Sequence, residues 1–335
     1  MGGANGAQQH GGNGRLFLTG GSGYVGRNLI RHFVERGVAV RALVRSDSSA
    51  KVVQELGAEP FRGDMVESDL GPAMQGIEWM IHAAADTNHG ESTREQERVN
   101  LQGTRNVFRS AREAGVKRGL HISTESVLLD GSPLVNADES TPFPAHPAGG
   151  YSRTKAEAER IALAQGVGGL QVVVLRPRFV WGRDDTTALP QLIEAANTGK
   201  LVWIDGGHYL TSTTHVGNLC RAAELALERG GAGEVYFVTD GEPVVFREFV
   251  SSLLESQGVA PPGKSVPRWL VNSLSRVAEF ASMLNMVRLK SPISRQEYAT
   301  LAVEVTLNID KARRELGYTP VVSLEEGLAE LRARR

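Results

Sequence analysis

Several features that mark secreted or membrane proteins are missing from this sequence. It contains a single cysteine, Cys220, so no disulfide can form within the chain, which suits a reducing compartment. No run of about 18 apolar residues is present, so no membrane-spanning helix is predicted. Residues 1–14 are rich in glycine, glutamine and asparagine and lack the apolar core of a signal peptide. These absences predict a cytoplasmic protein with a disordered tail over residues 1–14.

An excess of charge of one sign is also missing. The 335 residues include 37 Lys and Arg against 38 Asp and Glu, a formal net charge of −1, so neither a nucleic acid nor a membrane surface is a predicted partner. His208 and His215 have no third ligand nearby at a metal-binding spacing, so no metal site is predicted. His82 and His121 lie in apolar strand patterns and are interpreted as satisfied core histidines.

Glycines between an apolar run and an amphipathic run mark the N-terminal part of the chain. Residues 16–18 predict a buried strand and residues 27–36 a helix. Glycine lets the backbone turn sharply and approach a pyrophosphate, whose charge the N-terminus of the following helix stabilises. The stretch therefore predicts a dinucleotide site, with flexible-loop glycines as the alternative interpretation. The predicted cofactor contacts here are Gly20, Gly23, Tyr24, Val25 and Gly26.

Strand and helix patterns alternate through the first half of the chain. Further strands are predicted at residues 39–44, 57–63, 79–83, 119–123 and 170–175, and long helices at residues 91–114 and 151–165. This alternation predicts an α/β fold, a Rossmann-type doubly wound parallel sheet, over residues 15–180. Residues 181–335 predict mainly a smaller substrate-binding lobe, with about 211–240 returning to the first domain. Ligands bind at the carboxyl ends of such strands.

The residue after the second predicted strand bears on the choice of cofactor. NAD-binding proteins usually place an acidic residue there, whereas this chain has Arg45 followed by Ser46. A guanidinium and a hydroxyl suit the 2′-phosphate of NADP. The sequence therefore predicts a preference for NADP(H), with NAD(H) as the alternative because Asp47 is close by. Asp64 and Met65, after the third strand, are predicted to contact the adenine.

A tyrosine and a lysine stand four residues apart at the start of a predicted helix. Tyr151 and Lys155 therefore share one helix face. An ammonium near a phenol is expected to lower the phenol's pKa, which makes tyrosine a usable acid or base near neutral pH. Thr124, just past the fifth strand, places a hydroxyl at the same edge of the sheet. Its alternative role is to cap a turn.

These motifs together resemble the extended short-chain dehydrogenase/reductases over nearly the whole chain after Gly14. The motifs are Thr19-Gly-x-x-Gly-x-x-Gly26, His82-Ala83-Ala84-Ala85, Asn100-x-x-Gly103-Thr104-x-Asn106, Ser123-Thr124 and Tyr151-x-x-x-Lys155. The second half narrows the resemblance to the 3β-hydroxysteroid dehydrogenase-like and sterol dehydrogenase branch. The segments concerned are Arg176-Pro-Arg-Phe-Val-Trp-Gly182, His215-Val-Gly-Asn218, Tyr236-Phe-Val-Thr-Asp240 and Lys311-Ala-Arg-Arg-Glu-Leu-Gly-Tyr318.

The resemblance implies a role for each matching residue. Tyr151 would be the acid/base, Lys155 would bind the nicotinamide ribose and tune Tyr151, and Thr124 would orient the substrate oxygen. The long helices 91–114 and 151–165 would pair in a homodimer. The further cofactor contacts that it implies are Ala83, Ala84, Ala85, Asn100, Ser123, Tyr151, Lys155, Pro177, Phe179 and Val180.

Two residues that depart from a dehydratase pattern, and one apolar segment, bear on the predicted function. The stretch 121–127 is similar to a dehydratase pattern, but Glu125 and Ser126 stand where that pattern has Asp and Glu.

Residues 266–290 are predicted to be helical and rich in apolar side chains, and we expect one edge to roof a substrate cleft opposite Phe179 and Trp181. The sequence thus predicts an NAD(P)-dependent oxidoreductase that interconverts a secondary alcohol and a ketone on a hydrophobic substrate. The alternatives are a nucleotide-sugar epimerase or dehydratase with bound NAD, and a non-catalytic dinucleotide-sensing regulator.

Overall fold

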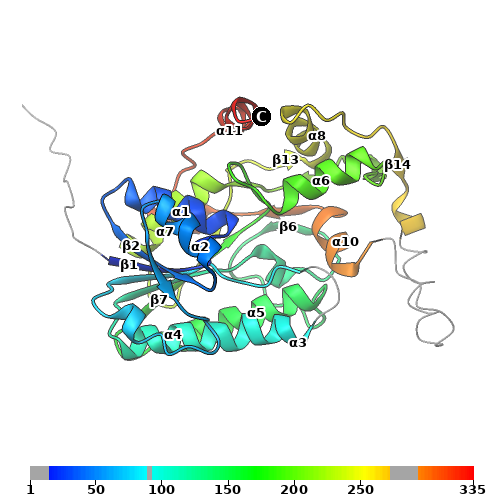
Figure 1. Cartoon of the computed structure of the whole chain (residues 1–335). Helices are drawn as coiled ribbons and strands as arrows, with labels where there is room; N and C mark the ends of the chain where they lie inside the picture. The colour runs from blue at the N-terminus through cyan, green and yellow to red at the C-terminus, as the bar shows by residue number, and fades with distance from the viewer. Residues whose placement is uncertain (1–14, 89–92, 272–292) are drawn as a thin grey trace, which may run out of the picture.

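A seven-stranded parallel sheet forms the centre of the protein, as the computed structural model shows for residues 15–88, 93–271 and 293–335 (Figure 1). Its strand order is β12-β7-β5-β4-β1-β2-β3. The strands are β1 (Arg15–Thr19), β2 (Ala39–Val44), β3 (Glu59–Arg62), β4 (Trp79–His82), β5 (Arg118–Ile122), β7 (Gln171–Pro177) and β12 (Val235–Val238). The order reverses at β1, so the crevice beside its carboxyl end is the place where such sheets bind ligands.

Helices cover both faces of this sheet, as predicted for a doubly wound fold (Figure 1). On one face lie α1 (Tyr24–Val34), α2 (Asp47–Glu55) and α7 (Val216–Arg229), and on the other lie α3 (Arg94–Glu97), α4 (Thr104–Glu113) and α5 (Gly150–Ala164). A π-helical segment, η2 (Arg98–Gly103), joins α3 to α4. The predicted helix over 91–114 is therefore interrupted, and residues 91–92 lie outside the described residues.

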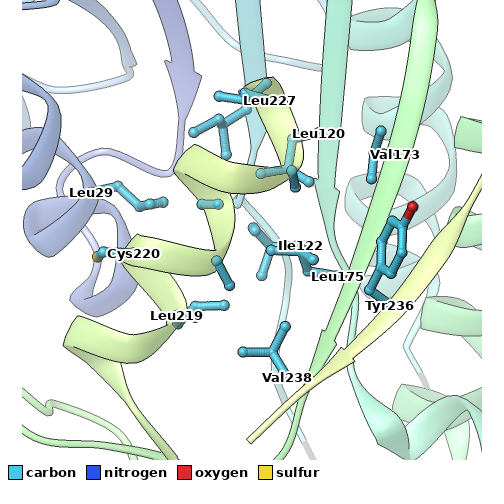
Figure 2. Packing of buried hydrophobic residues seen from close by; sticks show 14 of the residues in the cluster. Leu29, Leu120, Ile122, Val173, Leu175, Leu219, Cys220, Leu227, Tyr236 and Val238 are labelled. Carbon is cyan, nitrogen blue, oxygen red and sulfur yellow. The ribbon is translucent and has the colours of Figure 1, made fainter. Parts of the chain in front are cut away.

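The single cysteine belongs to helix α7, which packs into the protein's core. Leu219 and Leu227 of α7 lie among apolar side chains of β5, β7 and β12, whereas Cys220 lies on the side of α7 that faces Leu29 of α1 (Figure 2). Cys220 is 2% exposed and packs as a small core residue. Because α7 and β12 come from residues 216–238, the second half of the chain completes the first domain's sheet.

The remaining elements form a second lobe beside the carboxyl ends of the central strands (Figure 1). A four-stranded sheet has the order β13-β10-β15-β6, and two short parallel pairs join β8 to β11 and β9 to β14. The strands are β6 (Leu134–Ala137), β8 (Val180–Trp181), β9 (Trp203–Ile204), β10 (Leu210–Thr211), β11 (Thr214–His215), β13 (Val244–Val245), β14 (Ser265–Val266) and β15 (Val305–Leu307). The helices are α6 (Ala188–Asn197), α8 (Phe246–Ser256), α10 (Arg295–Leu301) and α11 (Leu324–Ala333).

Short helical turns complete the described chain. The 3-10 turns are η1 (Pro72–Met74), η3 (Glu125–Leu128) and η4 (Asp205–Gly207), and η5 (Ala312–Leu316) is π-helical. Ser323 and Glu326 form a capping box at the start of α11, because each side chain bonds the other residue's backbone N–H. Within the described residues, no helix combines the length and apolar content needed to cross a membrane.

The structure corrects the prediction for the apolar segment after residue 265. Val266 belongs to strand β14 and not to a helix, because it pairs with Ile204 of β9. Residues 268–271 are helical, and residues 272–292 lie outside the described residues. The expected cleft roof therefore lies largely outside them as well. The predicted tail, residues 1–14, also lies outside them.

Candidate active site

The glycine turn between β1 and α1 is shaped by two close backbone approaches. Gly20 has φ +76°, and a Cβ there would lie 2.8 Å from the Ala84 nitrogen in the loop after β4. A Cβ at Gly26 would lie 2.0 Å from the Gly20 carbonyl oxygen. Only glycine fits either position, because backbone atoms cannot move aside as a flexible side chain can. The turn thereby brings the loop of Ala83, Ala84 and Ala85 beside the start of α1.

The start of α1 fits the phosphates of a dinucleotide. Gly23 is the N-cap and is exposed, and no side chain caps this end of the helix. The first-turn N–H groups, including that of Val25, therefore have no side-chain acceptor and can bind an anion. The Tyr24 side chain cannot contribute, because it is 6% exposed and points into the protein. Burial raises the pKa of the Tyr24 phenol, and the Asp185 carboxylate raises it further.

The end of β2 presents Arg45 to solvent. Its side chain is 71% exposed, and Nη1 lies 3.8 Å from Asp64 Oδ2, a loose pair that solvent screens. Ser46 caps α2 by accepting a bond from the Ser49 backbone N–H, so its hydroxyl oxygen lies at the helix N-terminus. Met65, unlike Asp64, is buried and packs close to the backbone of Gly103. Arg45 and Asp64 therefore lie near each other after β2 and β3, and their predicted contacts with the adenosine, like that of Met65, stay predictions.

Asn100 holds the loop after β4 against α5. Its side-chain oxygen accepts a bond from the Asp86 N–H, and its side-chain nitrogen donates to the Asp86 carbonyl and to Thr154 Oγ1. Asn100 belongs to the π-helical segment η2, a distortion that often accompanies functional sites. Asn100, which is predicted to contact the cofactor, thus holds the loop after β4 in place at the edge of the site.

Tyr151 and Lys155 lie in the first two turns of α5, on the face toward the sheet. Lys155 is buried, and its Nζ donates to the Ile122 carbonyl at 2.8 Å, at the carboxyl end of β5. Burial lowers the pKa of Lys155 to about 8, and the Glu159 carboxylate opposes part of that shift. Tyr151, near the start of α5, is partly buried.

The pKa of Tyr151 is shifted in the direction opposite to the prediction. Burial raises it above its ordinary value, the Glu125 carboxylate raises it further, and a hydrogen bond with the Thr124 side chain opposes these effects. The prediction of a lowered pKa was wrong because it counted the Lys155 charge and included neither the burial of the phenol nor the neighbouring Glu125 carboxylate. At neutral pH, Tyr151 is therefore a phenol ready to donate its proton.

Two neighbouring hydroxyls at the end of β5 each donate to a buried carboxylate. Ser123 Oγ donates to Glu159 Oε2 at 2.6 Å, and Thr124 Oγ1 donates to Glu125 Oε2 at 2.7 Å. Arg176 pairs with Glu159, and Arg178 pairs with Glu125 at 2.6 Å. Ser123 and Thr124 were predicted at this position from the sequence, but no catalytic role was predicted for Glu125, Glu159, Arg176 or Arg178. The alternation Arg176-Pro-Arg178 after an apolar strand was the available signal.

The residues after β7 form the border of the site toward the second lobe. Pro177 ends β7, and Val180 begins β8. Phe179 has φ +40°, an uncommon value for a bulky residue, and its ring packs edge-on against Phe246 and Phe249 of α8.

Trp181 corrects one prediction about the cleft. It is 1% exposed, its Nε1 donates to Asp240, and its ring contacts those of His215 and Phe249. Trp181 is therefore part of the second lobe's core and not a wall of a cleft. The reason is that its indole N–H bonds the partly buried Asp240 carboxylate while its ring packs against other rings of the lobe.

The two strand histidines differ in how they are satisfied. His82 bonds Thr19 at 2.7 Å and Thr104 at 2.9 Å, and its pKa is lowered to about 3 by burial and by Lys155. His121 has no partner for either ring nitrogen among the described residues, so its prediction as a satisfied core histidine was wrong. Burial, Lys155 and His82 lower the pKa of His121. The described residues hold no cluster of three or more His, Cys, Asp or Glu suited to a metal ion.

Comparison with solved structures supports the fold. The chain superimposes with a TM-score of 0.73 on the dTDP-glucose 4,6-dehydratase DesIV from Streptomyces venezuelae, solved with NAD bound. The match covers 95% of this chain and 96% of the other, at 24% identity. At this identity the likeness shows the shared Rossmann-type architecture and no more.

Sequence comparison identifies the family. Residues 17–268 match the model of the 3-beta hydroxysteroid dehydrogenase/isomerase family. The chain is 47% identical over 319 residues to the 4-hydroxy-2-methyl-3-oxo-4-farnesyl-3,4-dihydroquinoline-1-oxide ketoreductase of Stigmatella aurantiaca, covering 95% of this chain and 96% of that one. It is 33% identical over 328 residues to the 2-alkyl-3-oxoalkanoate reductase of Stenotrophomonas maltophilia, covering 95% and 98%. The chain therefore belongs to the 3-beta hydroxysteroid dehydrogenase/isomerase family, and it is an oxidoreductase that interconverts alcohols and ketones with a nicotinamide dinucleotide.

Proposed function

We propose that this enzyme uses Tyr151 as its acid/base, with Thr124 beside the substrate oxygen and Lys155 below the nicotinamide ribose. The observation that carries this assignment is the position of the three residues at the carboxyl ends of β5 and the start of α5. That edge of the sheet also holds the glycine turn and the loop of Ala83 to Ala85. A phenol, a hydroxyl and an ammonium are thus held close to the place where a dinucleotide would lie.

Each residue has a defined task in ketone reduction. A bound reduced nicotinamide supplies a hydride to the carbonyl carbon and is itself oxidised. Tyr151 donates its phenolic proton to the carbonyl oxygen, and one proton from solvent restores the phenol. Lys155, fixed by the Ile122 carbonyl, lies one helical turn from Tyr151 and presents its ammonium to the ribose hydroxyls. The reverse sequence oxidises the alcohol.

Replacing Tyr151 by phenylalanine tests this assignment. Turnover in Tyr151→Phe should fall by at least about a thousandfold, within the range that general acid–base catalysis and its loss span. Cofactor affinity, measured by quenching of tryptophan fluorescence, should remain within about threefold of the parent. Turnover close to that of the parent would refute the role of Tyr151.

The cofactor is proposed to be NADP(H) in preference to NAD(H). The exposed Arg45 and the hydroxyl of Ser46 at the N-terminus of α2 support this choice, because a 2′-phosphate would bond a guanidinium and a helix end. Arg45→Asp should move the preference toward NAD by roughly ten- to a hundredfold, since a charge-assisted bond contributes about 1.5–3 kcal/mol. Steady-state kinetics with both cofactors would decide, and a parent enzyme that already prefers NAD would refute the proposal.

The substrate is proposed to be a hydrophobic ketone or alcohol, with a fused-ring or long-alkyl body. Two similar enzymes are named for a farnesylated quinoline and for 2-alkyl-3-oxoalkanoates, both of which carry apolar chains. Phe179, at the border of the site, supplies an aromatic wall. Each Å² of apolar substrate surface buried contributes about 25 cal/mol, so catalytic efficiency should rise with alkyl length in a series of ketones. A flat series would refute the apolar pocket.

The dehydratase alternative is disfavoured by the state of Glu125. A dehydratase needs an acid and a base that are free to exchange protons with the sugar. Glu125 is 3% exposed and paired with Arg178, and the next residue is Ser126, which offers no carboxylate. These contacts support the oxidoreductase. Turnover of nucleotide sugars without turnover of apolar ketones would reverse the choice.

A homodimer through α4 and α5 is proposed as the assembly. The outer faces of the two helices are exposed and carry both signs of charge, with Arg109 paired to Glu113 and Arg153 paired to Glu97. A two-fold axis would set the arginines of one copy against the glutamates of the other. Such an interface would be polar and sensitive to salt.

A further inference from the structure

The helix that carries Tyr151 begins without a cap of its own. Gly149 is the N-cap residue of α5 and has no side chain that could accept a hydrogen bond. The first N–H groups of a helix have no acceptor within the helix, and an N-cap side chain usually bonds the N–H two or three residues further on. Tyr151 and Ser152 hold those two positions in α5. The first turn of α5 therefore needs an acceptor from elsewhere in the protein.

Gln296 of α10 supplies this acceptor. Its Oε1 accepts a hydrogen bond from the Ser152 backbone N–H at 3.2 Å and a second one from the Ser152 hydroxyl at 2.9 Å. Both residues are buried, Gln296 at 2% and Ser152 at 0% exposed. A Cβ on Gly149 would lie 2.9 Å from the same oxygen, so a local capping side chain and the Gln296 amide would compete for one space. A residue 144 positions further along the chain than Ser152 thus caps α5.

The amide of Gln296 is used through its oxygen alone. The Ser152 backbone N–H can only donate, so the amide must turn its oxygen toward α5. Gln296 Nε2 is then buried without a hydrogen-bond partner among the described residues. An unsatisfied buried donor costs stability, so the contact made by Oε1 must offset that cost or serve the reaction.

Helix α10 is itself fixed on both sides of this contact. Ser294 and Glu297 form a capping box at its start, which holds the turn that carries Gln296. Ala299, one turn further on, is buried in an apolar cluster with Ala148, which directly precedes the N-cap of α5. Because α10 belongs to the second lobe, that lobe is joined through Gln296 to the helix of the proposed acid/base.

Tyr151 and Lys155 are held by different parts of the protein. Lys155 lies one turn further along α5, and its Nζ donates to the Ile122 carbonyl of β5 at 2.8 Å. Beside it, Asn100 of η2 donates to Thr154 Oγ1 at 3.1 Å. The turn that carries Tyr151 receives its backbone cap from α10 instead. Loss of that cap should therefore loosen Tyr151 and leave Lys155 in place.

We propose that Gln296 is a positioning residue, which caps α5 from the second lobe and holds the Tyr151 phenol at the place proposed for the substrate oxygen. This inference rests on the proposed role of Tyr151 as acid/base. Proton transfer needs a close and directed contact, so a loosened first turn lowers the rate of the chemical step. Dinucleotide binding, which is assigned to the glycine turn and Lys155, should change little.

The first test is amide hydrogen exchange of the whole enzyme, which needs no substrate. Gln296→Met keeps a side chain of similar length and removes its acceptor. Peptides that contain the Ser152 amide should exchange about tenfold faster in this variant, whereas peptides over residues 156–164 should not change, which shows that the fold is intact. Equal exchange at Ser152 in Gln296→Met and the parent would overturn the inference.

Gln257→Met is the matched control for both tests. Gln257 ends α8 in the second lobe and makes its side-chain hydrogen bonds through Nε2, to Ser256 Oγ and to the Leu331 carbonyl. The same substitution there should leave exchange at Ser152 and turnover as in the parent. An equal effect of the two substitutions would mean that any loss in the second lobe loosens α5, and would overturn the specific role of Gln296.

The second test is steady-state reduction of a 2-alkyl-3-oxoalkanoate with NADPH. In Gln296→Met, kcat should fall by about ten- to a hundredfold, with the dissociation constant of NADPH within about threefold of the parent. Gln296→Glu keeps an oxygen in the place of Oε1 at a helix N-terminus, so its kcat and its exchange at Ser152 should return to within about fivefold of the parent. A Gln296→Glu enzyme as slow as Gln296→Met would overturn the inference.

The two tests separate this inference from the proposed function. Faster exchange at Ser152 with an unchanged kcat in Gln296→Met would overturn the positioning role, even where Tyr151→Phe is inactive. A Tyr151→Phe enzyme with the turnover of the parent would refute the proposed function, and exchange at Ser152 would still decide whether Gln296 caps α5.

Discussion

The buried ammonium of Lys155 is predicted to lower the protein's free energy of unfolding. Its pKa falls from 10.5 to about 8 because the ammonium is buried. A shift of one unit corresponds to 1.36 kcal/mol, so the buried charge costs roughly 3 kcal/mol of folding free energy below pH 8. In Lys155→Met the charge is gone, but the Ile122 carbonyl loses its donor, which costs about 1 kcal/mol. The variant should therefore be more stable than the parent by about 2 kcal/mol at pH 7.5.

The sign of the pH dependence follows from proton counts. Between about pH 8 and 10.5 the unfolded chain keeps the Lys155 proton while the folded chain loses it. For this group the unfolded state then binds more protons, so the contribution of Lys155 to the parent's stability rises with pH. The advantage of Lys155→Met should shrink through this window and reverse to a deficit of about 1 kcal/mol at its upper end.

Urea unfolding followed by tryptophan fluorescence at pH 7.5, 9 and 10.5 measures this difference. Starting at pH 7.5 keeps His82 and His121 neutral in the folded state of both proteins. Buried groups such as Cys220, whose pKa burial raises to about 12, contribute equally to both proteins, so the difference between the two slopes reports Lys155. Lys51→Met is the matched control, because Lys51 is 79% exposed and should change stability by less than about 0.5 kcal/mol at every pH. A Lys155→Met variant that is less stable than the parent at pH 7.5, by an amount independent of pH, would refute the reasoning.

Three further predictions concern the glycine turn, the last helix and the assembly. Gly26→Ala should lose dinucleotide binding and stability together, because its Cβ would lie 2.0 Å from the Gly20 oxygen. In Gly23→Ala the Cβ would lie 3.3 Å from the same atom, so this variant should fold and lose binding alone. Calorimetry measures the binding of each variant, and thermal melts measure its stability. Ser323→Ala should lower the free energy of unfolding by about 1 kcal/mol, measured with urea, because α11 loses its capping box with Glu326. Light scattering at micromolar concentration should show a dimer that weakens at high salt, and a monomer at low salt would contradict the proposed interface.

Local patterns in the sequence were sufficient to predict the nucleotide-binding half. Strand β2 has the predicted bounds, because it is a short, mainly apolar run between polar turns. The glycine turn and the pair Tyr151 and Lys155 depend on spacings of three and four residues, which the chain carries without reference to its tertiary fold. For the same reason the capping box of α11 could be recognised from four consecutive residues.

Tertiary structure decided the second lobe and the electrostatics of the site. Strand β6 lies beside β15, which follows it by about 170 residues, so no local period could reveal their sheet. Glu125 and Arg178 are 53 positions apart and meet only because β5 and β7 are neighbours. The direction of the Tyr151 pKa shift depends on that meeting and on burial, which are properties of the packed chain. The sequence alone therefore predicted the groups that are proposed to do the chemistry. The fold determines which of them carry a proton, because charge–charge distances and desolvation exist only once the chain is folded.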